Sequence, residues 1–545
     1  MKTRAKVARR WLSAIGFVVV GSLVGCSGDQ EPVYAQLAGQ VGGVGGADSK
    51  ASHYAVSRFL EHASMGPSPT AVSQVRAQGL ESWIDRQQKM APSLIRTPND
   101  LANYELQDMV AHRRASKHSE TQLHNHFVGG EDQLRLRTTW VLSNFLVVST
   151  RKIQPYGASE YFNMLQTHAF GQYGDLLKAV TRSPAMGFYL DNSQNRRMSL
   201  NENYGRELMQ LFSVGLVQLN MDGTPKRDAQ GKMLETYGQK DVIEATRALT
   251  GWNFADPDQK RETSNHFNYG KPMVAHWAND HDTGPKLVLG KAIPGGQDAV
   301  KDLDSLVDIL ISHPNTAPFV SLRLIQGMTT SDPSPAYLQR VASVFAKTQG
   351  HLGQVIQAIL TDPEARAGDD PLKTIKGFGR IKEPHLLHTG LVRGLGCRLA
   401  IKSDWDPAQV WMAYSQQPFN AYSVFNFYPP NHRAPGSKLL APEQKMLNST
   451  EFSRRMSQYH NIMSNSNLLS DAGCDASVFE SAARKSNEHL VALIGERFFR
   501  GAMPAAVAQG LVEAHKNFWH DNNMMKLTGA MLEMAMLTPS FGVSK

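Results

Sequence analysis

The chain has 545 residues and a formal net charge of +8 at pH 7. Five basic residues and no acidic residue lie in residues 1–25, so a chain that loses this segment keeps a net charge of only +3. This small excess does not indicate a basic groove for nucleic acid, and we expect no nucleic-acid partner. The length allows a large hydrophobic core, in one domain or in two lobes.

The N-terminal segment has the pattern of a secretory signal. A basic region is followed by an apolar run from Trp11 to Val24, which is too short to span a bilayer comfortably. The run ends in Leu-Val-Gly-Cys26, which resembles the lipobox of bacterial lipoproteins. We therefore expect residues 1–25 to be a lipoprotein signal peptide and Cys26 to carry membrane lipid. Ser27 favours sorting to the outer membrane. The alternative is an ordinary signal with a chance cysteine, and the export route, Sec or twin-arginine, stays open.

Residues 26–50 are polar and glycine-rich, which is typical of a flexible tether. Residues 51–545 form the expected folded domain. Its apolar residues recur mostly at helical spacing, so we predict a mainly α fold. The first helices are expected around Phe59 and from Pro69 to Ile84. Further helices are predicted at 131–149, 158–169, 172–181, 199–214, 238–250, 297–312, 315–329, 335–348, 351–361, 405–416, 441–464, 475–497, 502–518 and 521–537.

One segment departs from the helical pattern. Residues 215–237 contain two turn signals, Asp222-Gly223 and Gln230-Gly231, between short alternating stretches. This arrangement predicts a β-hairpin insertion. A calcium loop using Asn220, Asp222 and Asp228 is the alternative, but the segment lacks the spacing and the final glutamate of an EF-hand. We favour the hairpin.

The stretch "SLNENYGRELMQLFSVGL", residues 199–216, raises the question of a catalytic helix. Ser199 and Glu202 have the spacing of a capping box, and Glu202 can also pair with Arg206 one turn later. Glu207 borders the apolar face and has no such structural explanation.

A carboxylate at the edge of an apolar face needs a partner or a cleft. Glu207 is therefore predicted either to form a buried salt bridge with Arg247 of the next helix or to act, with Asn203 on the same flank, in a site. Asn203, Glu207 and Arg247 are the catalytic candidates.

Three other patterns are weaker. His276, His281 and Asp282 could ligate a metal, although chance histidines in a surface loop explain them better, and we expect no cofactor. Cys397 and Cys474 could form a disulfide in an oxidising compartment. The segment "NFYPPNHRAPG", residues 426–436, could be a rigid aromatic wall for a sugar or peptide, or an ordinarily packed loop.

Several motifs together resemble one bacterial family. They are "NENYGRELMQLFSVG", "YGQKDVIEATRALTGWNF", "HDTGPKLVLG" and "PFNAYSVFNFYPPNHRAPG", and they occur in order from about residue 52 to the end. This chain is similar to the domain of unknown function 1800 family, whose members are exported and have no established reaction. The resemblance implies a partner, because such proteins are often encoded beside an exported, sulfatase-like and phosphatase-like family numbered 1501.

One departure from the family pattern bears on activity. Many relatives carry Trp-His-Asn-His-Phe where this chain has residues 141–145, Val-Leu-Ser-Asn-Phe. A separate His-Asn-His-Phe at residues 124–127 precedes the expected position and is interpreted as a coincidence. If the family acts through those histidines, this member has lost or altered the activity.

These observations lead to two functional hypotheses. The first is an exported cell-envelope lipoprotein that binds or assembles with an envelope partner. The second is a hydrolase that acts on an envelope or extracellular polymer through a carboxylate site near Glu207.

The lipid anchor is directly testable. Because only a cysteine thiol at this position can accept the lipid, the change Cys26→Ala is expected to abolish labelling by a radioactive fatty acid and to leave the precursor unprocessed by the lipoprotein peptidase. Labelling and a gel-shift assay measure both effects. Normal processing of the variant, together with an unlabelled wild-type protein, would contradict the lipoprotein assignment.

Overall fold

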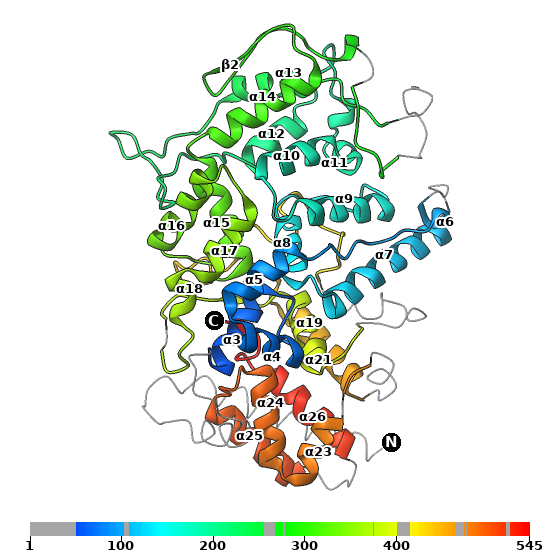
Figure 1. Ribbon diagram of the computed structural model, residues 1–545, viewed down its shortest axis with the longest axis vertical. Helices are drawn as coiled ribbons and strands as arrows, with labels where there is room; N and C mark the ends of the chain where they lie inside the picture. Colours follow the sequence, from blue (N-terminus) through cyan, green and yellow to red (C-terminus); the bar gives the residue numbers. More distant parts are fainter. Residues whose placement is uncertain are drawn as a thin grey trace.

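The computed structural model describes residues 51–102, 108–255, 268–275, 278–373, 375–399, 415–464, 473–475, 477–518 and 524–545. The expected signal peptide, the tether, Cys26, His276 and most of the predicted helix 405–416 lie outside these residues. Within them the chain is mainly helical, as predicted, with two short two-stranded sheets. Figure 1 shows an elongated arrangement of helices.

The first half of the chain supplies the helices at one end and in the middle of the molecule (Figure 1). Its elements are α3 (His53–Ala63), α4 (Pro69–Gln78), α5 (Leu80–Lys89), α6 (Asn99–Ala102), α7 (Met109–Gly129), α8 (Gln133–Ser143), α9 (Pro155–His168), α10 (Tyr173–Arg182), α11 (Pro184–Tyr189), η1 (Asn192–Gln194), α12 (Asn203–Gln210) and α13 (Gln239–Ala248).

The first elements of the second half, up to α14, lie beside α12 and α13 at the first end; the later ones complete the middle and form the opposite end, which is orange and red in Figure 1. Its elements are η2 (Ala278–Asp280), β1 (Lys286–Val288), β2 (Lys291–Ile293), α14 (Ala299–Ser312), α15 (Thr316–Met328), α16 (Pro335–Lys347), α17 (Leu352–Thr361), α18 (Pro363–Ala367), β3 (Arg380–Ile381), α19 (Pro384–Gly394), η3 (Pro442–Met446), α21 (Ser449–Ser464), α23 (Ser477–Lys485), α24 (Asn487–Phe498), α25 (Ala505–Phe518), α26 (Met524–Met536) and β4 (Val543–Ser544). Strand β1 pairs antiparallel with β2, and β3 pairs antiparallel with β4.

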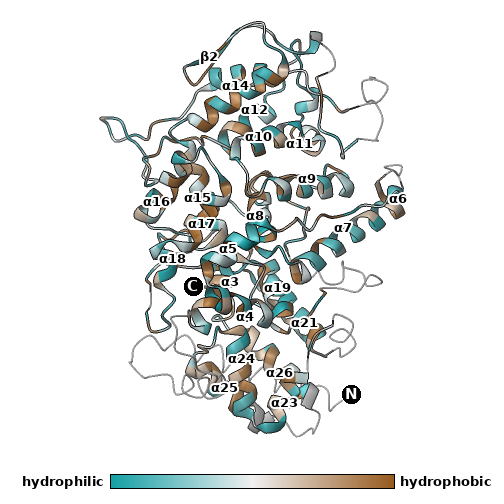
Figure 2. Ribbon diagram, viewed as in Figure 1, coloured by the Kyte–Doolittle hydropathy of each residue, from teal (hydrophilic) through white to brown (hydrophobic). Residues whose placement is uncertain are grey.

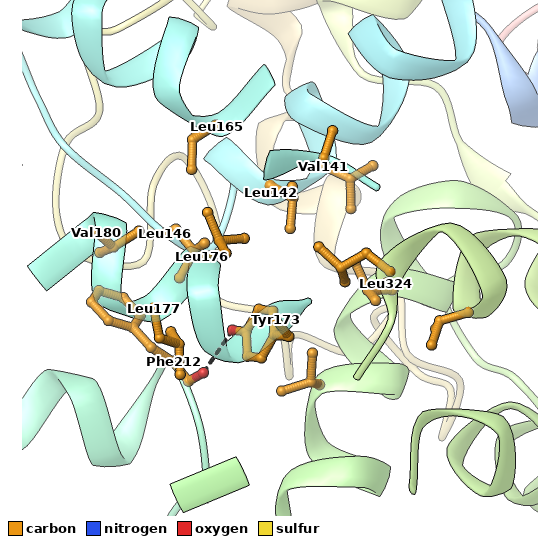
Figure 3. Packing of buried hydrophobic residues seen from close by; sticks show 14 of the residues in the cluster. Val141, Leu142, Leu146, Leu165, Tyr173, Leu176, Leu177, Val180, Phe212 and Leu324 are labelled. Atoms are coloured by element: carbon orange, nitrogen blue, oxygen red, sulfur yellow. Dashed lines mark hydrogen bonds between the residues drawn. The ribbon is translucent and has the colours of Figure 1, made fainter. Parts of the chain in front are cut away.

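The buried apolar residues form one large cluster and a second, smaller one. The large cluster is built by α3–α5 and α8–α17, and Figure 3 shows part of it around Tyr173, whose hydroxyl donates to the carbonyl of Phe212 at 2.7 Å. The second cluster is built by α19, α21 and α23–α26. These helices alternate apolar and polar stretches in Figure 2, as expected for amphipathic helices packed around a core.

Two features stabilise the second cluster. Cys397 and Cys474 are joined by a disulfide. Glu61 of α3 accepts hydrogen bonds from Lys382 and Arg500, each at 2.8 Å, and so ties the second cluster to the large one. None of the helices in the described ranges is long and apolar enough to cross a membrane.

Most predicted helices are present, with corrected limits. Gly79 has φ of +85° and divides the expected helix from Pro69 to Ile84 into α4 and α5. Ser486, in extended conformation, caps α24 and divides the predicted helix 475–497. Helix α12 begins at Asn203 rather than at residue 199, so the predicted capping box of Ser199 and Glu202 is wrong.

Segment 215–237 adopts bridged, hairpin-like backbone, although no continuous strand forms there. The backbone pairs Gln218 with both Leu234 and Lys226. Asp222 and Asp228 each accept hydrogen bonds from backbone amides two residues later, which is the geometry of Asx turns. Their oxygens thus stabilise the turns, and the hairpin explains these aspartates without calcium.

Candidate functional site

A cavity of about 470 Å³ lies between α8, the segment after α12, α15 and residues 424–443. Close backbone packing is present at two points along its wall. A Cβ at Gly327 of α15 would clash with Val141 of α8, and one at Gly215 would lie 2.6 Å from the ring of Phe319. The volume is within the usual range for small-molecule sites, and the wall is mostly apolar.

The aromatic and proline-rich segment forms one wall of this cavity. Tyr428, Pro429, Pro430 and Asn431, all from the predicted wall 426–436, line it. Two apolar lining residues at the mouth remain in contact with solvent, since Leu216 is 54% exposed and Phe425 is 41% exposed. The cavity therefore opens to solvent through an apolar rim.

A buried charge network centred on Arg380 forms part of the cavity wall and extends behind it. Its guanidinium contacts Glu383 at 2.5 Å and Glu443 at 2.8 Å, and all three side chains are at most 2% exposed. Arg380 and Arg137 both donate to the carbonyl of Gly327 in the last turn of α15. Cations are favoured there because the C-terminal carbonyls of a helix carry partial negative charge.

The two carboxylates of this network are fully engaged. Glu383 also accepts from Trp140 at 3.2 Å and from Gln416 at 2.6 Å. Glu443 also accepts from Ser331 at 2.9 Å. Burial alone would raise the pKa of Glu383, but the charges of Arg380 and Arg137 outweigh burial and lower that pKa to about 2. These carboxylates are structural anions rather than acid or base catalysts.

One charged group on the wall differs from this network. Arg323 of α15 donates to Gln326 at 3.0 Å and lies 5.1 Å from the ring centre of Phe319. Burial lowers its pKa to about 10, so the side chain is still a cation at neutral pH. Among the described residues, no carboxylate forms an ion pair with Arg323.

The structure does not pair the predicted catalytic candidates Glu207 and Arg247. Asn203 donates to Asp191 at 3.2 Å. Arg247 pairs with Glu244 and Asp282, each at 2.8 Å, so the predicted pair with Glu207 is wrong. Glu202 does pair with Arg206, at 2.7 Å, as predicted.

The direction in which Glu207 points from α12 explains why it does not pair with Arg247. Helices α12 and α13 pack together, but through Gly205, where a Cβ would lie 2.6 Å from Thr246. Glu207 is two residues further on, about 200° around the helix, and points elsewhere. One of its carboxylate oxygens is buried without a hydrogen-bond partner among the described residues. Burial raises the pKa of Glu207.

The weak metal candidates have other contacts. His281 lies 3.2 Å from Asp302, which also binds Lys286 at 2.5 Å, and Asp282 is held by Arg247. Across the described residues, no group of three or more His, Cys, Asp or Glu side chains is placed to hold a metal ion.

The structure also shows where the two stretches compared with the family's histidine pattern lie, namely residues 124–127 and residues 141–145. His124 stacks on His385 with ring centres 5.1 Å apart, inside the core beside Trp140. Burial lowers the pKa of both histidines, which keeps them neutral. Residues 141–145, which replace the histidine-rich pattern, contribute Val141, Asn144 and Phe145 to the cavity wall.

Sequence reasoning missed Arg323, Gln326 and Arg380 of this site. One signal was available, because Arg323 lies within the apolar run "VSLRLIQGM" of α15, four residues after Phe319. Residues 319, 322, 323, 326 and 327 recur at helical spacing and share the face that lines the cavity.

The fold and the cavity define a mainly helical protein with a ligand-sized apolar site and buried structural charges. The sequence model of the family described as "Protein of unknown function (DUF1800)" matches residues 58–543, and the chain belongs to that family. No curated protein and no solved structure matches the chain significantly.

The charge network predicts a specific pH dependence of stability. Because the pKa of Glu383 is lowered to about 2, its stabilisation is complete above about pH 4.5 and is lost as pH falls towards 2. Glu383→Gln should lower the free energy of unfolding by about 3–5 kcal/mol at pH 7. The difference from wild type should shrink by about 3 kcal/mol as the pH falls towards 2.

Urea unfolding at several pH values from 7 down to 2 measures this difference. The control is Glu81→Gln, which changes an exposed carboxylate on α5 and should lie within about 0.5 kcal/mol of wild type. A difference for Glu383→Gln that does not change with pH would show that the carboxylate does not stabilise the fold through its charge.

Proposed function

We propose that this chain is an exported cell-envelope lipoprotein that acts as a binding component, and that the cavity beside α15 receives an apolar group of its ligand. The observation that carries this proposal is the solvent-reaching cavity of about 470 Å³ with its mostly apolar wall. Covering apolar surface such as Leu216 and Phe425 stabilises a complex by about 25 cal/mol for each Å² removed from water.

The polar groups around the cavity favour binding over catalysis. Glu443 and Arg380 on its wall neutralise each other, and Glu383 behind them is held with a low pKa. Tyr428 stays protonated, because burial and the charges of Glu383 and Glu443 raise its pKa well above the usual range. Asn144 is hydrogen-bonded to Asn426 at 2.7 Å and cannot act as a general acid or base.

The proposed partners follow from the N-terminal pattern and from the family. Lipid on Cys26 would hold the protein at the envelope, with Ser27 favouring the outer membrane, and the tether of residues 26–50 would let the domain reach a neighbour. The proposed neighbour is an exported protein of the 1501 family. A pull-down assay with the two purified proteins tests this partnership. If the two do not co-elute when both are present at micromolar concentration, the proposed partnership is wrong.

Binding in the cavity can be measured with an uncharged apolar fluorophore, N-phenyl-1-naphthylamine. We expect wild type to bind it with increased fluorescence. Val424→Trp places a large side chain in the cavity wall and should weaken binding by about tenfold or more. The control is Val300→Trp, on an exposed position of α14, which should bind as wild type does.

Thermal melts show that both variants are folded before titration. Equal binding by wild type and both variants would mean that the fluorophore binds elsewhere. Absence of binding to wild type, both by this probe and by its sulfonate-bearing analogue, would contradict the proposed function.

A hydrolase site near Glu207 is the second candidate, and one observation favours it. A half-buried carboxylate with a raised pKa and an unpaired oxygen is the kind of group that serves as a general acid. The phenols of Tyr189 and Tyr237 and the cation of Arg206 are its titratable neighbours. However, Glu207 does not line the cavity.

The change Glu207→Gln separates a functional carboxylate from a structural one. Because the pKa of Glu207 is raised, its charged form destabilises the fold above about pH 4.5. The variant should therefore be as stable as wild type at pH 7, or more stable by up to about 1 kcal/mol. Any gain in the free energy of unfolding over wild type should vanish near pH 4.

The matched control is Glu244→Gln, which removes the partner of Arg247 and should lower the free energy of unfolding by about 1–3 kcal/mol. Urea unfolding measures both variants. A large loss for Glu207→Gln would show that its carboxylate has a structural partner, and unchanged hydrolysis of envelope polymers by this variant would remove the enzyme hypothesis.

A further inference from the structure

We infer that Arg323 is the anchor for a negatively charged group, so that the ligand of the cavity is an organic anion with an apolar body. This inference rests on the proposed binding function and assigns the chemical class of its ligand. It depends on the position of Arg323 in the cavity wall, where the other charged residues are paired with one another.

Arg323 lies in the cavity wall, and two neighbouring side chains position its guanidinium. It lies on the α15 face that carries Phe319, Leu322, Gln326 and Gly327 into the lining. Phe319 supports the flat guanidinium, whose centre lies 5.1 Å from the ring centre. One nitrogen donates to Gln326 at 3.0 Å. The four other N–H groups of the fork form no hydrogen bond to the described residues that would fix them.

Three buried arginines of the chain show how the half-buried Arg323 differs from them. Arg380 binds two carboxylates, and Arg500 binds Glu61 at 2.8 Å. Arg393 is also without a carboxylate partner, but it donates to the backbone carbonyls of Gly66, Phe127 and Val128. Arg323 has neither a carboxylate nor a set of carbonyls, and it alone among these four lies in the cavity without a compensating group.

The rest of the wall cannot neutralise Arg323. Glu443 is the acidic lining residue, and its oxygens are held by Arg380 and Ser331. The two cations Arg137 and Arg380 are balanced by Glu383 and Glu443, so the excess charge at the cavity is the single positive charge of Arg323. A charge in a poorly solvated place is stabilised by a counter-charge with hydrogen-bonding oxygens.

These features define the ligand by its chemistry. The planar fork of an arginine matches the paired oxygens of a carboxylate, sulfonate or phosphate. The apolar wall and the aromatic residues Phe425 and Tyr428 require an apolar body next to that group. An uncharged apolar molecule would cover the half-buried Arg323 without giving it an anionic partner, and a small inorganic anion would leave the apolar wall uncovered.

Two fluorophores with nearly the same ring system test the inference. 1-Anilinonaphthalene-8-sulfonate carries an anionic sulfonate, whereas N-phenyl-1-naphthylamine lacks it. We expect wild type to bind the anion more tightly. Arg323→Gln should weaken the binding of the anion by about tenfold and change the binding of the neutral probe by less than about twofold. Arg323→Lys should retain part of the preference, because it keeps the charge without the fork.

The control variant is Arg227→Gln, which removes an exposed cation on segment 215–237 and should leave both affinities unchanged. Displacement of the bound anion by decanoate and by decyl phosphate, with decanol as the neutral comparison, distinguishes a carboxylate from a phosphate as the preferred group. Melting curves confirm that each variant is folded.

The outcomes separate this inference from the proposed function. If neither probe binds wild type, the proposed function fails and the inference fails with it. If the neutral probe binds but Arg323→Gln leaves the anion's affinity unchanged, or weakens both probes equally, the inference is overturned while the apolar binding site stands. Selective loss of the anion, with displacement by the charged competitors only, supports it.

Discussion

The buried contact of Arg380 with Glu383 and Glu443 is the constraint on which the cavity depends. Arg380 lies on β3, Glu383 precedes α19, and Glu443 belongs to η3, while the Gly327 carbonyl that Arg380 binds ends α15. Three stretches that are distant in sequence, around residues 327, 380–383 and 443, therefore meet at one guanidinium. A buried ion network adds little net stability over apolar packing, but it permits one arrangement of these segments. That arrangement leaves the walls of the cavity apart instead of collapsed.

The charged side chains of this network stabilise the fold and are already paired, unlike the charge of Arg323. The network's cations and anions are matched and hydrogen-bonded, so they cannot respond to a ligand without breaking the fold. Arg323, one turn before Gly327, lies outside the network and is supported by a ring and an amide. A site with one available cation and no available proton donor or base near neutral pH suits recognition better than bond cleavage. Glu207 has the properties of a reactive carboxylate but lies away from the cavity.

Much of the fold could be predicted from sequence, and the failures have physical causes. Helices α14, α16 and α17 bury regular apolar stripes, and their predicted limits were accurate within two residues. Helix α7 was missed because up to residue 121 it buries small and polar side chains, and large apolar residues are buried only near its end. Helix α19 was missed because Pro384 begins it and Gly390 and Gly394 lie inside it. For the site, the aromatic wall was visible as a local pattern, whereas the roles of Arg380 and Arg323 depend on which carboxylates lie nearby, and those partners are up to 63 residues away.

The pairing of β3 with β4 also constrains how the chain can fold. Arg380 pairs with Ser544, and Glu61 contacts both Arg500 and Ser544, across separations of 439 and 483 residues. Contacts of such long range form late and slowly, because a very long loop must close first. Until residues beyond 500 have been synthesised, the buried pair of Glu61 and Lys382 lacks Arg500, and α21 lacks α26, the helix against which it packs. A partly synthesised chain therefore exposes apolar surface and is prone to aggregation until this segment is in place.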